Sequence, residues 1–567
     1  MKARLRLAVA VLAAASSAGA QTVAVTVDPA ADRRAISDLV YGVNFANATQ
    51  LEEIGYPVNR WGGNRKTRYN WELDVDNSAS DWFFTNYTGD GIPAQLPATS
   101  DADRFLLANR AARAESVLTL PTIGRVAGPD RARRWGFSVE EYGVQLHTEC
   151  TWTGFPEWCE PDAGNGLCNG ANPECVDGEI VGNLAADTTI EVQPSFLGEW
   201  VEFADSRVGA AAHGGLRFVA LDNEPMLWNS THRDIHPIPA TYDEVWAKGL
   251  AVALAAKSAD ADVQVLGPDT WGWCDLFTSA HDAAIGPSCI DGEDREAHGG
   301  LPFVAWVLEQ SCAWEAEHGV RPIDYLDVHY YPQNGEAFGD DSFATIRLQS
   351  IRELYDPTYF SSNWIQDEVM LVPRLRAWVD THCPGTRIAL TEYSWGDDDA
   401  TTGALAQAEV LAILGREGVD LATRWVVPET GSKTEEAFRL FLDFDGSGAK
   451  VFGDRVRAVS ADAATVGAYA IRGHSDELYL LFFNKATSSR TVVATIASPL
   501  DGGFDLYRFT TSTPLASAGA AAAPGGVLTL ALPARSATLA VGRIVSTLLF
   551  ADRFETSTAL GWSAIAP

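Results

Sequence analysis

Short apolar runs alternate with amphipathic stretches from residue 38 to about residue 430. Eight of these runs have the length and composition of buried strands: LVYGVNF, PVNRW, SVLTLP, LRFVALD, DVQVLGP, IDYLDVHYY, TRIALTE and LATRWVV. Several are separated by stretches with apolar positions three to four residues apart, such as ALAQAEVLAILGREG, which predict amphipathic helices. A strand and a helix repeated eight times is the pattern of a (β/α)8 TIM barrel, an α/β fold whose reactive side chains lie at the C-terminal ends of the strands.

The pattern changes after about residue 450 to short strands with turn signals between them. These strands are VGAYAIRG, ELYLLFFNK, RTVVATIA, FDLYRFT, GVLTLAL and SATLAVG, and they are typical of a β-sandwich. We interpret the stretch ASAGAAAAPGG, at residues 516–526, as a low-complexity loop within the sandwich. We therefore expect the barrel over residues 21–450, a C-terminal β-sandwich domain over residues 451–543 and a separate tail over residues 544–567.

Residues 1–20 are predicted to be a signal peptide. Lys2, Arg4 and Arg6 precede a short apolar stretch that closes on Ala-Gly-Ala. Cleavage near Ala20 would give a secreted, extracellular protein. No later segment has eighteen unbroken apolar residues, so we expect no membrane span.

The chain carries a formal net charge of −33 at pH 7, and loss of the signal peptide makes it more negative. A strongly negative protein repels phosphate backbones and anionic lipids. Nucleic acid is therefore excluded as a partner, and we expect a monomer.

Eight cysteines, an even number in an exported chain, predict disulfide bonds. Four of them crowd into a Cys-rich insert at about residues 147–180: Cys150, Cys159, Cys168 and Cys175. Their spacing lacks the paired CxxC of a zinc site, so a disulfide-stapled loop is favoured over a zinc knuckle. The other four cysteines could form two more bridges, but the sequence leaves every pairing open.

Two of the predicted strands end on a glutamate. LRFVALDNEP brings Glu224 to the end of the fourth strand, and RIALTEYSWG brings Glu392 to the end of the seventh. In a barrel both strands end at the same mouth, so the two carboxyl groups could act on one bond. Two carboxyl groups that flank a glycosidic bond are the usual catalytic groups for its hydrolysis. One protonates the leaving oxygen, while the other either attacks the sugar carbon or activates a water molecule.

A single glutamate after a strand is more often a surface residue or part of a structural ion pair. Two at matching strand ends, each beside aromatic residues, favour the catalytic interpretation over that alternative.

The segments that hold these residues resemble glycoside hydrolase family 44. They are NRWGGNRKTRYNWELDVDNSASDWFF, ALDNEPMLWNSTHRDIHPIP, VLGPDTWGW, LDVHYYPQ and LTEYSWG. The resemblance covers about residues 30–540, and the first two segments are long and specific. It implies that Glu224 is the general acid/base and Glu392 the nucleophile of a retaining double displacement.

The resemblance also implies internal cleavage of β-1,4-glucan chains, with cellulose-type and xyloglucan substrates. The sequence departs from the family's pattern mainly in the Cys-rich insert. This insert follows the third strand and would lie on the rim of the active site, so it leaves subsite specificity open.

Four further residues are candidates for support of the two glutamates. Asn223 could donate to the sugar 2-hydroxyl, or it could close the strand turn. Arg60 could keep Glu392 ionised through a bidentate contact, or form a structural salt bridge. Tyr331 could hydrogen-bond the nucleophile and His329 could tune the acid/base, although polar core packing would also explain both.

Tryptophans at or beyond the strand ends could stack on sugar rings. The candidates are Trp61, Trp71, Trp271, Trp273, Trp395 and Trp425. Some must belong to the core. Trp271 and Trp395 are the preferred stacking platforms, because each follows a strand end by only a few residues.

Carboxylate chemistry on a glycosidic bond requires no cofactor and no metal ion. DFDGSG at residues 443–448 resembles the start of a calcium loop, so a structural calcium is the alternative, but a tight turn explains the segment better. The preferred function is a secreted endo-β-1,4-glucanase or xyloglucanase that binds a polysaccharide substrate. The alternatives are another retaining β-glycanase, such as a xylanase or mannanase, and a non-catalytic polysaccharide-binding protein.

Overall fold

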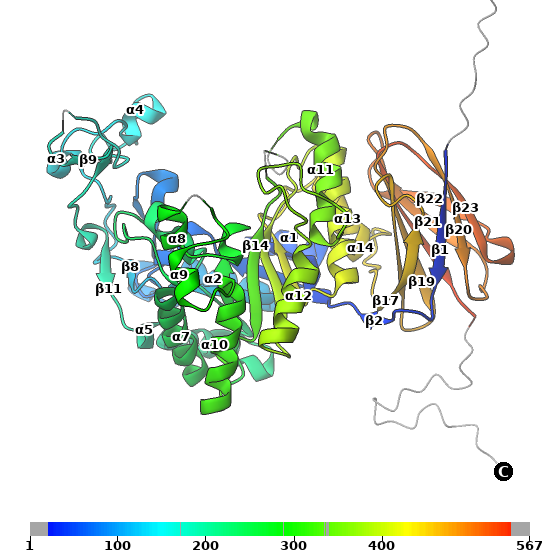
Figure 1. Cartoon of the computed structure of the whole chain (residues 1–567), viewed down its shortest axis with the longest axis horizontal. Coiled ribbons are helices and arrows are strands. Elements are labelled where there is room, and N and C mark those ends of the chain that lie inside the picture. Colours follow the sequence, from blue (N-terminus) through cyan, green and yellow to red (C-terminus); the bar gives the residue numbers. More distant parts are fainter. Residues whose placement is uncertain (1–20, 171, 287, 334, 336–338, 546–567) are drawn as a thin grey trace, which may run out of the picture.

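The computed structural model describes residues 21–545 except residues 171, 287, 334 and 336–338. The predicted signal peptide and nearly all of the predicted tail lie outside the described residues. Three parts follow one another across Figure 1: a small lobe, a barrel and a sandwich.

Eight parallel strands close into a barrel, which confirms the predicted fold class. In order around the barrel they are β12 (Phe218–Leu221), β13 (Gln264–Thr270), β14 (Tyr325–Tyr330), β15 (Arg387–Tyr393), β16 (Leu421–Arg424), β3 (Gly42–Asn44), β4 (Val58–Trp61) and β7 (Glu115–Leu120). Each overlaps one of the eight apolar runs identified in the sequence and extends at most two residues beyond it. Glu224 follows the fourth strand in chain order, and Glu392 lies near the end of the seventh, as expected.

A helix follows each barrel strand. These helices are α1 (Ala48–Ile54), α2 (Asp101–Ala112), α5 (Pro194–Val208), α7 (Tyr242–Ala259), α10 (Phe303–His318), α12 (Leu371–His382), α13 (Thr401–Glu417) and α14 (Lys433–Leu442). The start of α7 shows why they form where they do: the Thr241 side chain accepts a hydrogen bond from the Glu244 amide, and two acidic residues occupy the first turn.

The interior of the barrel changes character along its axis. At the N-terminal end the inward positions are apolar, and Val58, Val117, Phe218 and Tyr325 form part of one cluster. Successive inward positions along a strand are two residues apart. The next layer towards the mouth therefore contains Arg60, which follows Val58, and Asp327, which follows Tyr325. All of these side chains are buried. The apolar layer closes the bottom of the barrel, and the polar layer forms the floor of the mouth.

The second domain is a sandwich of mainly antiparallel strands, as predicted. Its strand order is β22 (Ala516–Ala521), β21 (Phe504–Phe509), β24 (Ser536–Arg543), β19 (Glu477–Asn484), β18 (Val466–Arg472), β17 (Asp454–Ser460), β1 (Gln21–Asp28), β20 (Arg490–Ile496) and β23 (Val527–Leu532), with β2 (Arg34–Ala35) beside β17. Alternate residues of these strands face a common apolar core.

Two sequence interpretations of this region are wrong. Residues 21–28 do not begin the barrel, because β1 pairs with β20 and β17 and buries Val23, Val25 and Val27 in the sandwich core. Of the stretch expected to be a loop, residues 516–521 instead form the edge strand β22, held by its pairing with β21. Most side chains of β22 are exposed, so it has no apolar alternation that could reveal it.

The barrel and sandwich meet along α13, which is buried over nearly its whole length. Lys485 of the sandwich reaches both carboxylate oxygens of Glu409 on α13 at 2.7 Å. The hydroxyl of Tyr469 donates to the same carboxylate at 3.1 Å. A helix that is covered on both sides can be apolar on most of its surface, which explains why small and aliphatic residues predominate in α13.

The Cys-rich insert forms a lobe beside the barrel mouth. It leaves and re-enters the barrel through the paired strands β8 (Arg125–Ala127) and β11 (Thr189–Glu191). The lobe contains α3 (Val139–Tyr142), α4 (Glu149–Thr153), β9 (Cys175–Val176) and β10 (Glu179–Ile180), and it projects beyond the barrel in Figure 1.

All eight cysteines are disulfide-bonded. The pairs are Cys150–Cys159, Cys168–Cys175, Cys274–Cys289 and Cys312–Cys383. The disulfide prediction is confirmed, and the zinc-knuckle alternative is wrong because no thiolate remains to bind a metal. A search of the described residues found no helix with the length and hydropathy of a membrane span.

Candidate active site

Glu224 lies on a left-handed turn just past β12. Its φ of 51° and ψ of 57° are uncommon for a residue with a side chain, and its amide donates to the carbonyl of Asp269 at 3.0 Å. The preceding Asp222 is buried and accepts hydrogen bonds from the amides of Thr122 and Ile123. These contacts fix the turn and direct the carboxyl group of Glu224 into the mouth.

Glu392 is held by one donor on each oxygen. Nη1 of Arg60 lies 2.8 Å from Oε1, and the Tyr331 hydroxyl donates to Oε2 at 2.9 Å. The register between β14 and β15 shifts just before Glu392, so this residue rather than Thr391 pairs with His329. Such irregularities re-aim side chains next to active sites.

The guanidinium group of Arg60 is fully buried and contacts several acceptors. Besides Glu392 it reaches Asp269 at 3.1 Å and the Asn223 side-chain oxygen at 3.0 Å through Nη2. The prediction of a bidentate contact between Arg60 and Glu392 is therefore wrong. Arg60 instead connects Glu392, the candidate nucleophile, to Asp269 and Asn223. Gly62 leaves the necessary room, since a Cβ there would lie 2.3 Å from Cζ of Arg60.

His329 lies between the carboxylates. Its Nδ1 is 2.9 Å from Glu224 and 3.6 Å from Glu392, and its Nε2 faces Asp269. Burial, the largest single influence, lowers the pKa of His329, but the carboxylates of Glu392 and Asp269 outweigh it and raise that pKa well above its usual value. The surroundings of the ring therefore favour its charged form.

The environment of Glu224 favours its protonated form. Burial is the main cause that raises the pKa of Glu224, and the negative charge of Glu392 adds to it, against the opposing hydrogen bond from His329. A carboxyl group with a raised pKa can keep its proton at a pH where an ordinary glutamate has lost it. Such a group is suited to protonate a leaving oxygen.

The two glutamates and His329 form a compact cluster. One ligand atom from each of these three side chains lies within 4.8 Å of the other two, the one such group of metal-ligand side chains found among the described residues. The positive charges of His329 and Arg60 balance the negative charges of the carboxylates, a role that a metal ion could otherwise take. The oxygens are also close enough to face one anomeric carbon from two sides.

Asn223 is anchored by both ends of its amide. Its oxygen accepts from Arg60 and from the Gly63 amide, each at 3.0 Å, and its nitrogen donates to Asn64 at 3.2 Å. The second N–H of this nitrogen can serve a bound sugar. Asn223 thus lies beside the two glutamates, where the sequence places it.

Most of the predicted stacking tryptophans are core residues instead. Trp61, Trp71, Trp273 and Trp395 are 7, 7, 3 and 1% exposed. The prediction that Trp395 is a stacking platform is wrong, because its indole N–H donates to Ser350 and its ring packs near Tyr330. Only half-buried Trp271 and Trp425 keep part of the ring accessible, and Trp425 packs edge-on against Phe45.

Several site residues escaped the sequence analysis. Asp269, which contacts both Arg60 and His329, lies near the end of β13 after a buried run and so carries the same signal that identified Glu224. Asn44, the last residue of β3, accepts from Arg60 at 3.2 Å, so it too carries the strand-end signal. Trp364 is 46% exposed and donates to Gln333. Trp364 lies in a loop that does not directly follow a barrel strand, so the positions of the strand ends could not indicate it.

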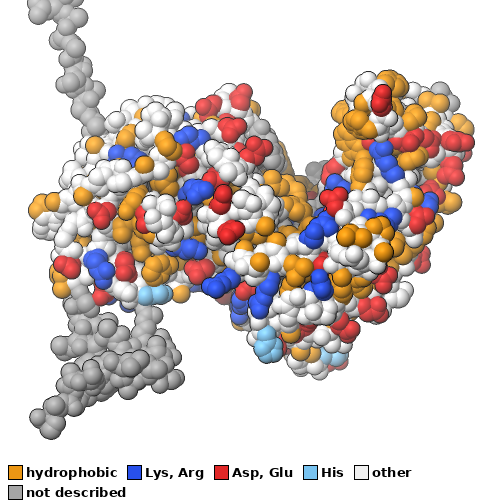
Figure 2. Space-filling model, turned by 180° about the vertical axis from the view of Figure 1, so that it is seen from behind, with side chains coloured by type: hydrophobic (Ala, Val, Ile, Leu, Met, Phe, Trp, Pro, Cys, Tyr) orange, Lys and Arg blue, Asp and Glu red, His pale blue; other side chains and the backbone are white. Residues whose placement is uncertain are grey.

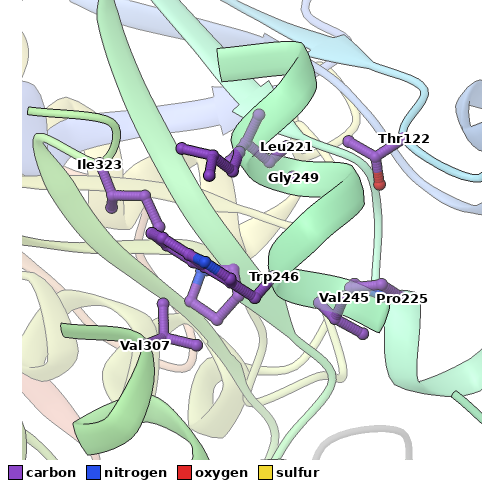
Figure 3. A pocket seen from close by; sticks show the side chains of 10 residues that line it. Thr122, Leu221, Pro225, Val245, Trp246, Gly249, Val307 and Ile323 are labelled. Atoms are coloured by element: carbon purple, nitrogen blue, oxygen red, sulfur yellow. The ribbon is translucent and has the colours of Figure 1, made fainter. Parts of the chain in front are cut away.

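A small apolar cavity lies outside the barrel, away from this chemistry. In Figure 3 the ring of Trp246 lies among Leu221, Val307 and Ile323. The cavity measures about 10 Å³, which is room for at most about one water molecule. It is a packing gap under α7 and cannot hold a substrate.

Comparison with known proteins connects this site to a family. The model of glycoside hydrolase family 44 matches residues 75–334. A bifunctional glucanase-xylanase from a metagenome library, CelM2, is 34% identical and superposes with a TM-score of 0.86, over 92% of this chain and 99% of that chain. A Paenibacillus polymyxa xyloglucanase of family 44 is 26% identical, with a TM-score of 0.74 over 92% of this chain and 100% of that one.

A curated relative is longer than this chain. The beta-mannanase/endoglucanase A of Caldicellulosiruptor saccharolyticus is 27% identical over 87% of this chain, and the match spans 36% of that relative's length. The match to CelM2, by contrast, covers nearly all of both chains. The chain belongs to glycoside hydrolase family 44.

Proposed function

We propose that the protein is an endo-acting glycoside hydrolase that cleaves β-1,4-glucan backbones, of cellulose type and in xyloglucan, by a retaining double displacement. The observation that carries the proposal is the pairing of Glu224 and Glu392 within 4.8 Å across His329 at the barrel mouth. Retaining enzymes hold their carboxyl groups about 5–5.5 Å apart, whereas inverting enzymes need about 6.5–9.5 Å to admit a water molecule. An oxygen of Glu224 lies within 4.8 Å of an oxygen of Glu392, which favours the shorter of these two arrangements and hence direct attack by a carboxylate.

In the first step an oxygen of Glu392 attacks the anomeric carbon. The bond from that carbon to the leaving oxygen breaks, and the oxygen takes the proton of Glu224. This leaves a glycosyl ester on Glu392 and frees the first product. Arg60 and Tyr331, one on each oxygen of Glu392, hold the carboxylate in line for attack.

In the second step water attacks the anomeric carbon and gives a proton to Glu224. The ester bond breaks and returns Glu392 as a carboxylate. Esterification has removed the negative charge that helps to raise the pKa of Glu224, so this residue can alternate between acid and base. Two inversions at one carbon give net retention.

The relatives support glucan as the substrate. CelM2 and the Caldicellulosiruptor protein are named as glucanases, and the Paenibacillus protein is named as a xyloglucanase. The bifunctional glucanase-xylanase name of the 34% identical relative favours xylan as the second candidate substrate. A mannanase has less support, because the relative whose name includes it extends far beyond the matched region.

We further propose that the protein acts outside the cell, as a monomer, and without a catalytic metal. Four disulfide bonds favour an oxidising compartment. At the site, His329 and Arg60 supply the positive charge that balances the carboxylates. Chelators should therefore leave turnover unchanged, and a lowered melting temperature alone would report a structural calcium.

The experiment that tests the function is a reducing-sugar assay on a polysaccharide panel with product sizes followed over time. The panel contains carboxymethylcellulose, xyloglucan, xylan and mannan. We expect the first two to be cleaved fastest, with an early fall in polymer size because cleavage is internal. Release of only small sugars from an unshortened polymer would contradict endo action, and faster cleavage of xylan or mannan would overturn the substrate assignment.

A further inference from the structure

A second pocket lies between the disulfide-rich lobe and the barrel, about 320 Å³ in volume. Figure 2 shows the lobe standing away from the barrel, with a hollow between the two bodies. The pocket is lined by Ser80, Asp81, Trp82, Phe83 and Phe84 from the segment after β4, by His147, Trp152, Asn165 and Leu167 from the lobe, and by Arg233. Its size falls at the lower end of the range for small-molecule sites, about 300–1,000 Å³.

The lobe presents aromatic rings to solvent at the rim of this pocket. The disulfide Cys150–Cys159 closes a ten-residue loop that carries Trp152, Phe155 and Trp158, which are 64, 70 and 58% exposed. Large aromatic side chains that remain exposed together on a disulfide-closed loop are typical of a surface that binds a ligand or a partner. Trp152 lines the pocket itself and lies edge-on to His147 at 5.5 Å.

The opposite wall of the pocket is rigid. The indole N–H of Trp82 donates at 2.6 Å to Glu149, a fully buried carboxylate that also pairs with Arg133. Phe84 packs edge-on against Phe137 of the lobe at 5.0 Å. The lobe is thus fixed to the barrel at the base of the pocket, so two tryptophans from two different segments face one preformed space.

A chain of side chains joins the pocket to the reaction centre. Asp81 accepts from the Asn64 amide at 3.1 Å, and Asn64 accepts in turn from Asn223 at 3.2 Å. The negative charge of Glu392 reaches far enough to help raise the pKa of Asp81, after the larger effect of burial. A ligand in the pocket would therefore lie along the same cleft as the bond to be cleaved, beyond Asn64.

The lining selects a class of ligand. Indole and imidazole rings offer apolar faces, while Asp81 and Asn165 offer acceptors and donors at the sides. A neutral pyranose unit, with apolar C–H faces and hydroxyl edges, matches this mixture. Asp81 and Arg233 contribute one charge of each sign to the lining, which suits a neutral ligand, and the net charge of −33 disfavours an anionic one.

We propose that this pocket is a remote subsite that binds a sugar unit of the polysaccharide chain whose glycosidic bond is cleaved at Glu224 and Glu392. The proposal rests on the proposed function and assigns the disulfide-rich lobe a part in it. The lobe lengthens the cleft, and Trp152 is the stacking residue that it contributes.

The test compares long and short substrates in the variant Trp152→Ala. A substrate that spans only the reaction centre, 2,4-dinitrophenyl cellobioside, should be cleaved with kcat/KM within about twofold of the wild type. On cellohexaose and xyloglucan, both uncharged, kcat/KM should fall about tenfold, the loss expected for an aromatic anchor. Trp152→Tyr should recover most of the loss, because it restores a ring.

The matched control is Trp314→Ala. Trp314 stacks on His318 at the C-terminal end of α10, which lies at the far end of the barrel from the mouth. This variant removes a partly exposed indole without touching the cleft, so we expect wild-type kcat/KM on every substrate. An equal loss in both variants would overturn the subsite.

Binding to an inactive background separates the two proposals. In Glu392→Gln protein, calorimetry should show about tenfold weaker binding of cellohexaose when Trp152→Ala is added, with cellobiose unaffected. Unchanged binding, or equal losses on long and short ligands, would overturn the subsite. A wild-type protein that cleaves no polysaccharide would overturn the proposed function instead, while the binding comparison would still decide the subsite.

Discussion

The barrel mouth and the sandwich core are both built from strands with alternate residues facing inward, yet their interiors differ. In the sandwich the inward residues are apolar, as in β1 with Val23, Val25 and Val27. At the barrel mouth the inward positions include Arg60 and His329, both without exposed surface. The apolar interior of the sandwich stabilises the fold. The buried charges at the barrel mouth lower the stability of the fold, but they supply the groups that catalysis needs.

Buried charge also occurs where the two domains meet, but there it has a different character. Glu409 and Lys485 form a closed pair that is 1–2% exposed and faces no cleft. At the mouth, Glu224 keeps 13% of its side chain exposed beside a fully buried His329. A charge cluster with one side open to solvent can receive a substrate, and a closed pair can only connect domains.

The largest effect should come from the nucleophile. We expect Glu392→Gly to lower kcat on carboxymethylcellulose at least about 10⁴-fold, because a group essential to a concerted catalytic unit is lost. Added azide or formate should restore part of the turnover by replacing the carboxylate. Glu409→Gln, which alters an equally buried glutamate at the domain boundary, should retain turnover per folded molecule. Near-native activity of Glu392→Gly would refute its role.

The domain-boundary pair should affect stability rather than chemistry. Lys485→Met leaves Glu409 buried without its cation, and we expect the free energy of unfolding to fall by about 3–5 kcal/mol. Urea unfolding followed by fluorescence measures this loss. The double variant with Glu409→Gln should recover part of it, because no uncompensated charge remains. An unchanged midpoint for Lys485→Met would show that the pair does not hold the domains together.

A single methyl group should disturb the mouth without removing any reacting group. In Gly62→Ala the new Cβ would lie 2.3 Å from Cζ of Arg60, so the guanidinium must move away from Glu392. We expect kcat/KM to fall about 100-fold, as for a misplacement of about 1 Å. Gly272→Ala is the control, since no atom lies within 4 Å of its added Cβ. Equal activity of the two variants would contradict the positioning role of Arg60.

The smallest effect concerns pH. Because the pKa of Glu224 is raised, its protonated form persists to higher pH than in an ordinary glutamate, and activity should fall as pH rises through that pKa. Above it, kcat/KM on cellohexaose should decline about tenfold per pH unit. The decline should vanish with 2,4-dinitrophenyl cellobioside, whose leaving group needs no proton. The same alkaline limb on both substrates would show that Glu224 is not the acid.

The barrel could be predicted because each strand is a continuous apolar run that ends on polar residues. This pattern gave the fold and the positions of Glu224 and Glu392. The boundary at residue 21 was misjudged because a strand's sequence does not reveal which sheet it joins: QTVAVTVD alternates clearly, but its partners lie more than 400 residues away.

The surroundings of the two glutamates were harder to predict. Proximity to a strand end suggested Trp395 as a stacking platform, but only the fold shows that its ring turns into the core against Ser350. Asp269 carried the same strand-end signal as Glu224 and was overlooked. The pocket behind Trp152 depends on two segments that the sequence does not bring together, so no local pattern could have indicated it.

The central claim is that Glu392 itself attacks the anomeric carbon while Glu224 supplies the proton. NMR of the reducing end released from cellohexaose at early times tests it most directly. The account predicts the β anomer first, with the α anomer growing only at the rate of mutarotation, because two inversions retain the configuration. An α anomer as the first product would mean that water attacks directly, and it would contradict the roles of both glutamates.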